Sequence, residues 1–214
     1  MRASAGKMDG RAAALDVIAG MLREAGSNAE VELRLGRIVD GAYESGVDHA
    51  AFERVRARLR AGVGLVTSPE AFTHEVHSEG GVIRDVESGE HARKTRVRQT
   101  MLRMLGTPFA VRACLSTEER VSPPRARARC RQAADTAVRA KLRESFVYRD
   151  KARYDLTRCV TASVTGGMIA APRCTYEVEV EAVGEITAES LLLKMEDVAG
   201  FLGPRPSGYA VHCA

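Results

Sequence analysis

The stretch Tyr176-Glu177-Val178-Glu179-Val180-Glu181-Ala182 alternates acidic and apolar residues along its length. Side chains of an extended strand point alternately to opposite faces of a sheet, so the pattern predicts a strand with three glutamates on one face. Taken alone, such an alternation is most often the solvated face of a sheet. The chemistry of this strand therefore depends on what the rest of the chain places beside it.

A second segment, near the amino terminus, has the same alternation. Glu30 and Glu32 alternate with Val31 and Leu33. If the two strands are neighbours in one closed sheet, their carboxylates converge, and like charges 4–5 Å apart repel by roughly 3–4 kcal/mol per pair at an effective dielectric near 20. Cations must then lie among these carboxylates. Oxygen ligands favour a hard ion, Mg²⁺ or Mn²⁺, over zinc.

The segments between these two strands carry basic residues in matching positions. Lys141 and Arg143 are two residues apart and share a face, as do Arg153, Asp155 and Thr157. The residues expected to face inward are the acids Glu30, Glu32, Glu118, Asp155, Glu177, Glu179 and Glu181 and the bases Arg84, Lys94, Arg112, Lys141, Arg143 and Arg153. Interleaved charges of this kind suit a polyphosphate held between a metal ion and basic side chains, with a carboxylate orienting the attacking water.

The periodicity of the rest of the chain predicts an α+β protein with an antiparallel sheet. Asp48 and Thr187 are good N-caps for two of the expected helices. The expected helices are residues 10–25, 48–60 and 188–202, and the expected strands are 29–38, several within 72–118, and three near 137–147, 151–160 and 173–183. A sheet with an inward charged face and helices outside is a closed barrel with a polar lumen. We expect one domain over residues 1–204, with its core at 29–183, and a loose or surface-lying tail at 205–214.

Composition excludes several classes of protein. No apolar run approaches the ~20 residues that cross a bilayer, and the polar amino terminus is unlike a signal peptide, so we expect neither membrane association nor secretion. Five dispersed cysteines without a Cys-x-x-Cys pair predict reduced thiols in an intracellular compartment. Aromatic residues make up 5% of the chain and tryptophan is absent, which favours recognition of phosphates over recognition of bases.

With these residues in place, the chain resembles the tunnel-fold, metal-dependent RNA triphosphatases of fungal, protist and large-virus mRNA capping. The resemblance covers about residues 29–183. It rests on Glu30-Val31-Glu32-Leu33-Arg34-Leu35-Gly36, Lys141-Leu142-Arg143, Arg153-Tyr154-Asp155-Leu156-Thr157 and Glu177-Val178-Glu179-Val180-Glu181. It implies a closed eight-stranded antiparallel β-barrel, the triphosphate tunnel. It also implies removal of the γ-phosphate from 5′-triphosphate RNA, the first step of capping, and hydrolysis of nucleoside triphosphates with Mn²⁺.

The resemblance also implies a role for each inward residue. The metal ligands would be Glu30, Glu32 and Glu181. Glu118 and Glu179 would position or activate the water, and Glu177 would support the lumen network. The phosphate-binding set would be Arg84, Lys94, Lys141, Arg143 and Arg153, oriented by Asp155 and Thr157, and we assign the inward Arg112 to the same set. The chain departs from the family pattern at Arg34, where lysine is usual, and in the short, arginine-rich region 84–103.

The resemblance further implies partners and a place in the cell. The expected partners are the 5′-triphosphate end of nascent RNA and an RNA guanylyltransferase, with the protein a monomer or a homodimer. No segment matches the long amino-terminal arm with which some relatives bind the guanylyltransferase. The expected location is intracellular: the nucleus for a cellular eukaryote, the cytoplasm or the virion for a virus.

Three other functions are compatible with parts of the sequence. A tunnel-type phosphatase could act on inorganic triphosphate, thiamine triphosphate or nucleotides. A cysteine phosphatase would use the Cys-x5-Arg spacing of Cys114 and Arg120, but no glycine shapes a phosphate loop there and two glutamates lie inside it. A non-enzymatic RNA-binding module would use the basic run Arg125–Arg131.

Overall fold

The computed structural model describes residues 10–62, 64–78, 81–86, 91–122, 136–165 and 168–213. The helices are α1 (Gly10–Glu24), α2 (His49–Arg60) and α4 (Ala188–Gly200). The strands are β1 (Ala29–Val39), β2 (Ala42–Ser45), β3 (Leu65–Ser78), β4 (Gly81–Val86), β5 (His91–Leu105), β6 (Phe109–Val121), β7 (Thr136–Tyr148), β8 (Ala152–Thr165), β9 (Met168–Ile169), β10 (Arg173–Ala182) and β11 (Gly208–Cys213). The basic run Arg125–Arg131 lies entirely outside the described residues.

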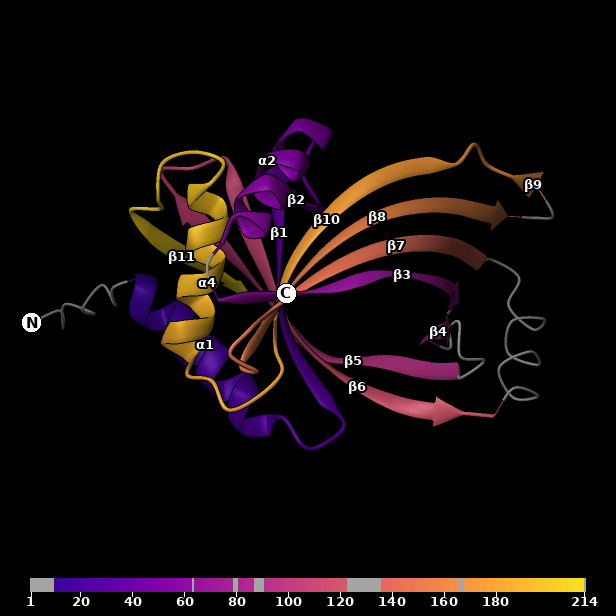
Figure 1. Ribbon diagram of the computed structural model, residues 1–214, viewed down its shortest axis with the longest axis horizontal. Helices are drawn as coiled ribbons and strands as arrows, with labels where there is room; N and C mark the ends of the chain where they lie inside the picture. Colours follow the sequence, from indigo (N-terminus) through magenta and orange to yellow (C-terminus); the bar gives the residue numbers. More distant parts are fainter. Residues whose placement is uncertain are drawn as a thin grey trace, which may run out of the picture.

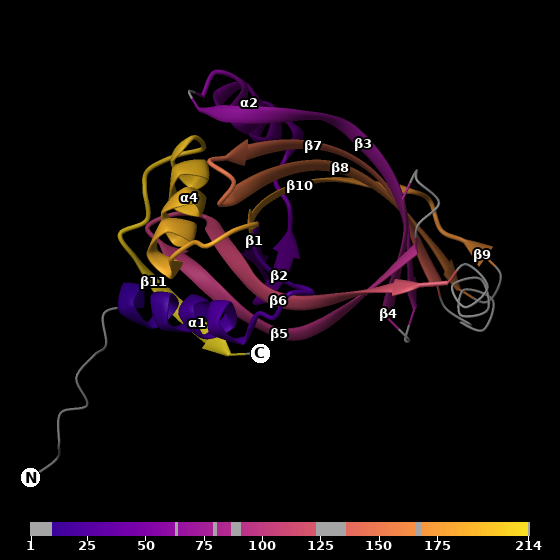
Figure 2. The same cartoon turned by 60° about the horizontal axis from the view of Figure 1, so that its bottom comes forward.

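The strands form one antiparallel sheet that bends around an interior space (Figures 1 and 2). Its order is β10-β1-β6-β5-β4-β3-β7-β8-β9, and β8 also pairs with β10. In Figure 2, β7 and β8 arch over one side of the interior while β5 and β6 run along the other. The predicted α+β class and inward-curving antiparallel sheet are confirmed.

The prediction of a closed eight-stranded barrel is only partly correct. Within the described ranges the sheet has eleven strands, and β4, which joins β3 to β5, is six residues long. Beyond β4, residues Thr100–Leu105 of β5 pair with β11, and in the described part of the chain no pairing joins β3 directly to β5. Hydrogen bonding therefore does not close the sheet along its full length. At the end of β5, β11 occupies the strand edge with which β3 would pair in a closed barrel.

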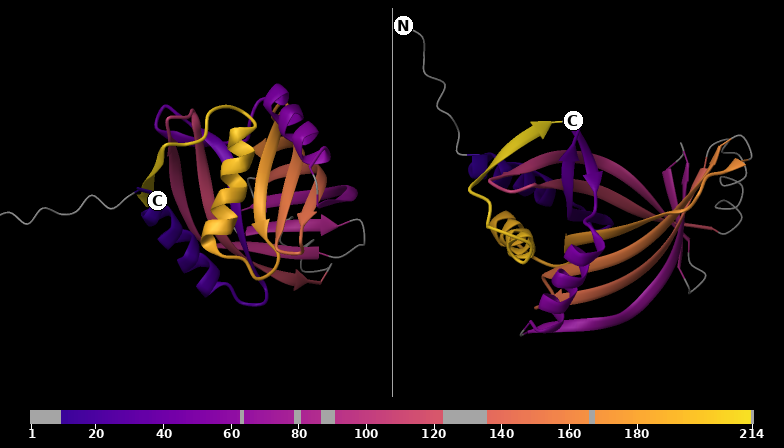
Figure 3. Two further views of the ribbon diagram at one scale, coloured as in Figure 1. Left: turned by 60° about the vertical axis from the view of Figure 1, so that its left-hand side comes forward. Right: turned by 90° about the horizontal axis from the view of Figure 1, so that it is seen from above.

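The helices lie outside the sheet, as predicted (Figure 3). The side chain of Asp48 accepts a hydrogen bond from the Ala51 amide, and that of Thr187 accepts one from Ser190, which confirms both N-caps. α4 packs on β1 and β10, α1 packs on β11 and α4, and α2 packs on β3 and β10. Leu33 and Val180, which alternate with the glutamates, are fully buried in the core on the helix side.

The carboxyl-terminal tail, which was expected to be loose or to lie over the surface, contains a strand of the sheet. Residues Gly208–Cys213 form β11, and Tyr209 is buried with its hydroxyl donating to Glu196 of α4 at 2.9 Å. Four other segments were missed: β2, the first part of β3 from Leu65, the end of β8 beyond Val160, and β9. None of the helices that the structure describes has the length and apolarity needed to span a membrane.

Candidate active site in the lumen

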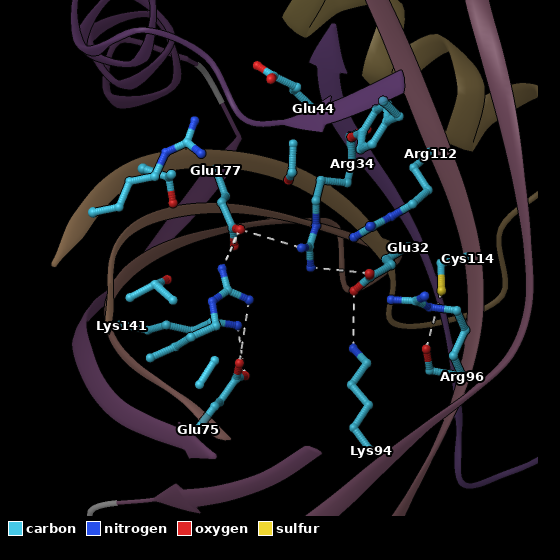
Figure 4. A pocket seen from close by; sticks show the side chains of 18 of the residues that line it. Glu32, Arg34, Glu44, Glu75, Lys94, Arg96, Arg112, Cys114, Lys141 and Glu177 are labelled. Carbon is cyan, nitrogen blue, oxygen red and sulfur yellow. Dashed lines mark hydrogen bonds and ion pairs between the residues drawn. The ribbon is translucent and has the colours of Figure 1, made fainter. Parts of the chain in front are cut away.

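The interior of the sheet holds a cavity of about 810 Å³ with many charged side chains (Figure 4). Its lining includes eight basic residues, Arg34, Lys94, Arg96, Arg112, Arg139, Lys141, Arg143 and Arg173, and four acidic residues, Glu32, Glu44, Glu75 and Glu177. The basic side chains thus exceed the acidic ones by four. A cavity with this excess of positive charge favours a multiply charged anion.

The two glutamate-bearing strands are direct neighbours, which is the condition on which the convergence of their carboxylates depended. β1 and β10 pair so that Glu32 lies opposite Glu181 and Arg34 lies opposite Glu179. Glu32, Glu177, Glu179 and Glu181 are all buried on the lumen side, with exposed fractions of 2–8%. The carboxylates therefore converge inside the molecule and do not form a solvated face.

Arg34 holds most of these carboxylates together. Its guanidinium forms an ion pair with Glu179, and it lies 3.3 Å from Glu32 and 3.5 Å from Glu177 (Figure 4). Burial alone would raise the pKa of Glu179, but Arg34, Arg143 and Lys141 outweigh burial and hold that pKa well below its usual value. Glu179 is therefore an ionised hydrogen-bond acceptor at neutral pH. The sequence-derived roles did not include Arg34.

Lys94 of β5 reaches the same group of acids from the facing wall. Its ammonium lies 2.6 Å from Glu30 and 3.1 Å from Glu32. Burial lowers the pKa of Lys94, but the two glutamates more than reverse that effect and raise it. Lys94 was predicted to bind phosphate, and in this structure it pairs with two of the predicted metal ligands.

The three predicted metal ligands lie close to one another. Glu30 precedes Glu32 by two residues on the same face, and Glu181 lies opposite Glu32. Burial, together with the charge of Glu30, raises the pKa of Glu181 to about 8, so these carboxylates destabilise one another's charge. A divalent cation would relieve that repulsion, and an all-oxygen donor set suits Mg²⁺ or Mn²⁺, so the donors fit such an ion. Among the described residues, however, no three acidic, histidine or cysteine side chains are already gathered around one point as ligands.

Asp155 of β8 organises a second part of the network. It accepts hydrogen bonds from Ser145 at 2.6 Å and from Arg153 at 3.0 Å, and it lies 3.1 Å from Arg143. Arg143 also donates to Thr157 at 3.3 Å. Asp155 therefore contacts two arginines of the lumen, and Thr157 contacts one of them. Arg153 in turn pairs with Glu181 at 2.6 Å.

The wall formed by β3 and β7 adds residues that sequence reasoning missed. Glu75 is 2% exposed and pairs with Lys141 at 2.7 Å. Arg139, two residues before Lys141, binds Glu177 at 2.5 Å and donates to the Cys159 sulfur at 3.1 Å. The two-residue spacing of Arg139, Lys141 and Arg143 was a visible signal for Arg139. Glu75 had a weaker signal, because no other acidic residue alternates with it along β3.

The remaining predicted residues occupy different places. Arg112 lines the cavity, with its guanidinium 5.4 Å from the centre of the Tyr43 ring. Glu118 lies opposite Lys94 in the β5–β6 pairing but is not part of the cavity lining. Arg84 lies in β4 opposite Glu75, and its side chain is outside the described residues.

Some of the cavity's polar groups are left for a ligand. Within the described ranges, Arg96, Arg112 and Arg173 form no ion pair with a carboxylate, although all three line the cavity. One carboxylate oxygen of Glu177 (Oε2) and the Arg112 Nε are buried without a hydrogen-bond partner in the described part of the chain. Buried polar groups without partners are costly, so a bound anion and its hydration would stabilise them.

The Cys-x5-Arg spacing does not form a phosphate-binding loop. Cys114 through Arg120 lie within the single extended strand β6, and the Cys114 sulfur lies 3.4 Å from the Ser116 hydroxyl. A loop that cradles a phosphate needs successive amides that turn toward one point, which an extended strand cannot provide. Cys114, Cys159 and Cys174 are free thiols, as predicted, and the side chains of Cys130 and Cys213 lie outside the described residues.

Comparison with known proteins agrees with this geometry. Residues 82–196 match the protein family described as "mRNA capping enzyme, beta chain". The fold is similar to that of S. pombe Pct1 RNA triphosphatase, with a TM-score of 0.63 and 16% identity over 89% of this chain and 90% of the other. It is also similar to the RNA triphosphatase domain of a trifunctional mimivirus mRNA capping enzyme, with a TM-score of 0.58 and 15% identity over 88% of this chain and 96% of that one. A search of curated proteins found no match.

Proposed function

The chain belongs to the mRNA capping enzyme beta-chain family, and from this membership we propose that it removes the γ-phosphate from 5′-triphosphate RNA, leaving a 5′-diphosphate end and phosphate. One observation carries the proposal: the lumen cavity is lined by eight basic and four acidic side chains, and a row of buried glutamates lies on its β1–β10 wall. Phosphoryl transfer to water needs both features, because cations must neutralise the phosphate oxygens while a carboxylate orients the water.

The basic residues divide into two groups with different tasks. Arg96, Arg112 and Arg173 line the cavity without carboxylate partners among the described residues, so they are available to bind phosphate oxygens directly. Arg139, Lys141 and Arg143 are each held by a lumen carboxylate, which orients them before the substrate arrives. Such preorganisation lowers the cost of binding the transition state. We assign Lys94, Arg153 and Arg84 to the phosphate-binding set as well.

We propose Glu30, Glu32 and Glu181 as the ligands of a divalent cation, Mg²⁺ or Mn²⁺. When bound, this ion supplies positive charge to the phosphate oxygens on the β1–β10 wall. Lys94 and Arg153, which pair with these carboxylates, would then be released toward the phosphates. Both cations would thus be available to the phosphate oxygens once the carboxylates hold the metal ion.

We propose that Glu179 orients the attacking water as a hydrogen-bond acceptor. Its low pKa makes it a weak proton acceptor, so its contribution is orientation of the water. Glu118, opposite Lys94, is the second candidate for this role, and Glu177 supports the network through Arg34 and Arg139.

At the level of the whole molecule, we propose that the eight strands from β10 to β8 act as the tunnel of this family, with β11 and the helices as its outer support. We also propose that the protein works with an RNA guanylyltransferase, which would receive the diphosphate end. This places it where nascent RNA is made: the nucleus of a cellular eukaryote, or the cytoplasm or virion for a virus.

Phosphate release from γ-labelled triphosphate RNA, a nucleoside triphosphate and inorganic tripolyphosphate tests the proposal. With Mg²⁺ or Mn²⁺ we expect release from RNA, and we expect a chelator to abolish it. Glu179→Gln should lower the rate by about 100-fold or more, as loss of one preorganised polar group does. Glu119→Gln, one residue beyond Glu118 on the exposed side of β6, is the matched control and should be unaffected. If phosphate is released from tripolyphosphate but not from RNA, inorganic triphosphate is the substrate and the RNA proposal is wrong.

A further inference from the structure

The wall of the lumen is interrupted between β2 and the start of β10. β1 pairs with β10 only at residues 32–34, and from Gly36 to Val39 it pairs with β2 instead. Among the described residues, a single bridge ties the end of β2 back to β10: the Val47 amide donates to the Tyr176 carbonyl at 2.9 Å. The first residues of β10 therefore have β8 on one side and an opening on the other.

The backbone of the connection after β2 lies close to the backbone of β10 at the edge of this opening. Gly46 has a φ of +98°, and a Cβ atom there would lie 2.6 Å from the Tyr176 carbonyl oxygen. Only glycine allows this conformation and this approach without strain. The rim of the opening is thus held in place by a specific backbone contact.

A groove of about 310 Å³ lies at this opening. Its lining includes Arg37, Asp48, His49, Cys174 and Tyr176. It shares four lining residues with the lumen cavity, namely Glu44, Ser45, Arg173 and Thr175. The groove therefore adjoins the proposed triphosphate site at these four residues. Its volume is at the lower end of the ~300–1,000 Å³ typical of ligand pockets.

The chemistry of the groove differs from that of the lumen. Its two arginines are balanced by two acids, and Arg37 is paired with Asp48 at 3.1 Å. The groove therefore has none of the positive excess that would attract another phosphate. It offers two rings instead, because His49 and Tyr176 stack with centroids 4.9 Å apart and planes tilted by 31°. The His49 side chain is 66% exposed, so one face of its ring is open to a partner.

We propose that this groove, defined by His49, Tyr176, Cys174 and Arg37, binds the first nucleoside of the substrate while its triphosphate lies in the lumen. The base stacks on the His49–Tyr176 pair, and Thr175, which lines both the groove and the lumen cavity, lies beside the ribose at the junction. This inference rests on the proposed function and deepens it, because it explains how a site for polyphosphate selects one with a nucleoside attached. The nucleoside belongs either to the 5′ end of RNA or to a free nucleoside triphosphate.

The test compares kcat/KM for triphosphate RNA, a nucleoside triphosphate and inorganic tripolyphosphate in the native protein and two variants. His49→Ala removes a stacking ring, and Cys174→Phe fills the groove from an exposed position. We expect each variant to lose about tenfold on RNA and nucleotide, the loss of roughly one stacking contact, and to keep its rate on tripolyphosphate. His212→Ala, an exposed histidine on β11, is the control and should change none of the three rates.

Two results would overturn the proposal, provided that thermal unfolding of the variants is unchanged. One is an equal loss of kcat/KM on all three substrates, and the other is no loss of kcat/KM on any of them. Equilibrium binding separates this proposal from the proposed function. If the native protein hydrolyses nothing but binds nucleoside triphosphate about tenfold more tightly than tripolyphosphate, and His49→Ala removes that preference, the groove stands and the hydrolase proposal fails. If RNA is hydrolysed and His49→Ala has native selectivity, the groove proposal fails and the hydrolase proposal stands.

Discussion

Arg34 of β1 lies directly opposite Glu179 of β10, and its guanidinium forms an ion pair with that carboxylate in a part of the lumen almost closed to solvent. The same guanidinium reaches Glu32 and Glu177, so one cation stabilises three glutamates from two strands. The two halves of the acidic wall are thus joined through Arg34.

Substitution of Arg34 should therefore affect both stability and activity. Arg34→Gln leaves buried carboxylates without their shared cation, and loss of one partner of a buried ion pair costs about 3–5 kcal/mol of unfolding free energy. We expect phosphate release to fall by about 100-fold or more. Arg34→Lys keeps the charge but not the branched donor geometry, so its stability and its rate of phosphate release should lie between those of the native protein and Arg34→Gln. Denaturant unfolding and phosphate release measured on both variants check this order, and equal stability of Arg34→Gln and the native protein would contradict it.

Arg112 should be important for substrate binding and unimportant for folding. It lines the cavity without a carboxylate partner among the described residues, and burial, with Arg34 nearby, lowers its pKa. Arg112→Gln should raise KM about tenfold, the value of one charge-assisted hydrogen bond, and leave the unfolding midpoint unchanged. Arg143→Gln is the comparison, because it also removes partners of Asp155 and Thr157 and should lower both the midpoint and kcat. A large drop in the midpoint for Arg112→Gln would show that its role is structural.

Cys114→Ser should retain most of the activity. The thiol lies on an extended strand beside Ser116, and serine is close to it in size and can replace its hydrogen bond. We expect phosphate release within about threefold of the native rate, since no covalent step passes through the sulfur. Complete loss of activity in a stably folded Cys114→Ser variant would favour a cysteine phosphatase.

Glu144 provides a pH-dependent test of how α2 is attached to the sheet. It is buried on β7, and it accepts hydrogen bonds from Arg56 at 2.7 Å and from Arg60 at 2.9 Å. Burial alone would raise the pKa of Glu144, but the two arginines outweigh burial and hold the pKa below its usual value. A lowered carboxyl pKa contributes stability that is fully present above the unfolded-state pKa, about 4.3, and is lost as pH falls through the lower folded-state value.

We therefore expect Glu144→Gln to cost about 1–3 kcal/mol at pH 7. The difference from the native protein should shrink below about pH 4.3. Urea unfolding of both proteins across pH 3–8 measures the difference. A difference that stays constant down to the lowest pH would mean that the ion pairs contribute little and that the cost comes from packing.

Local patterns were sufficient to predict most of the fold. Period-two alternation placed β1 and β10, and the caps Asp48 and Thr187 placed two helices to within two residues of their observed bounds. Local patterns could not predict which strands pair. The place of β11 against β5 depends on a long-range contact through Tyr209 and Glu196, which no local period encodes. That same contact explains why the closed-barrel prediction was only partly correct.

The candidate site shows the same division. Residues in alternating runs, such as Glu179 and Arg143, were predicted and do face the lumen. Glu75 was missed because no acidic residue lies two positions before or after it on β3, and only the pairing of β3 with β7 brings it to Lys141. The ring pair of His49 and Tyr176 was missed because its members are far apart in the sequence.

The most direct test of γ-phosphate removal is end-group analysis of γ-labelled triphosphate RNA after incubation with Mn²⁺ and either the native protein or Glu30→Gln. Glu30 is a proposed metal ligand, and its side chain is partly exposed, so the substitution should leave the fold intact. We predict that the native protein releases the label as phosphate and leaves a diphosphate end, whereas Glu30→Gln releases almost none. Full turnover by Glu30→Gln, or a product without the diphosphate end, would contradict the central claim.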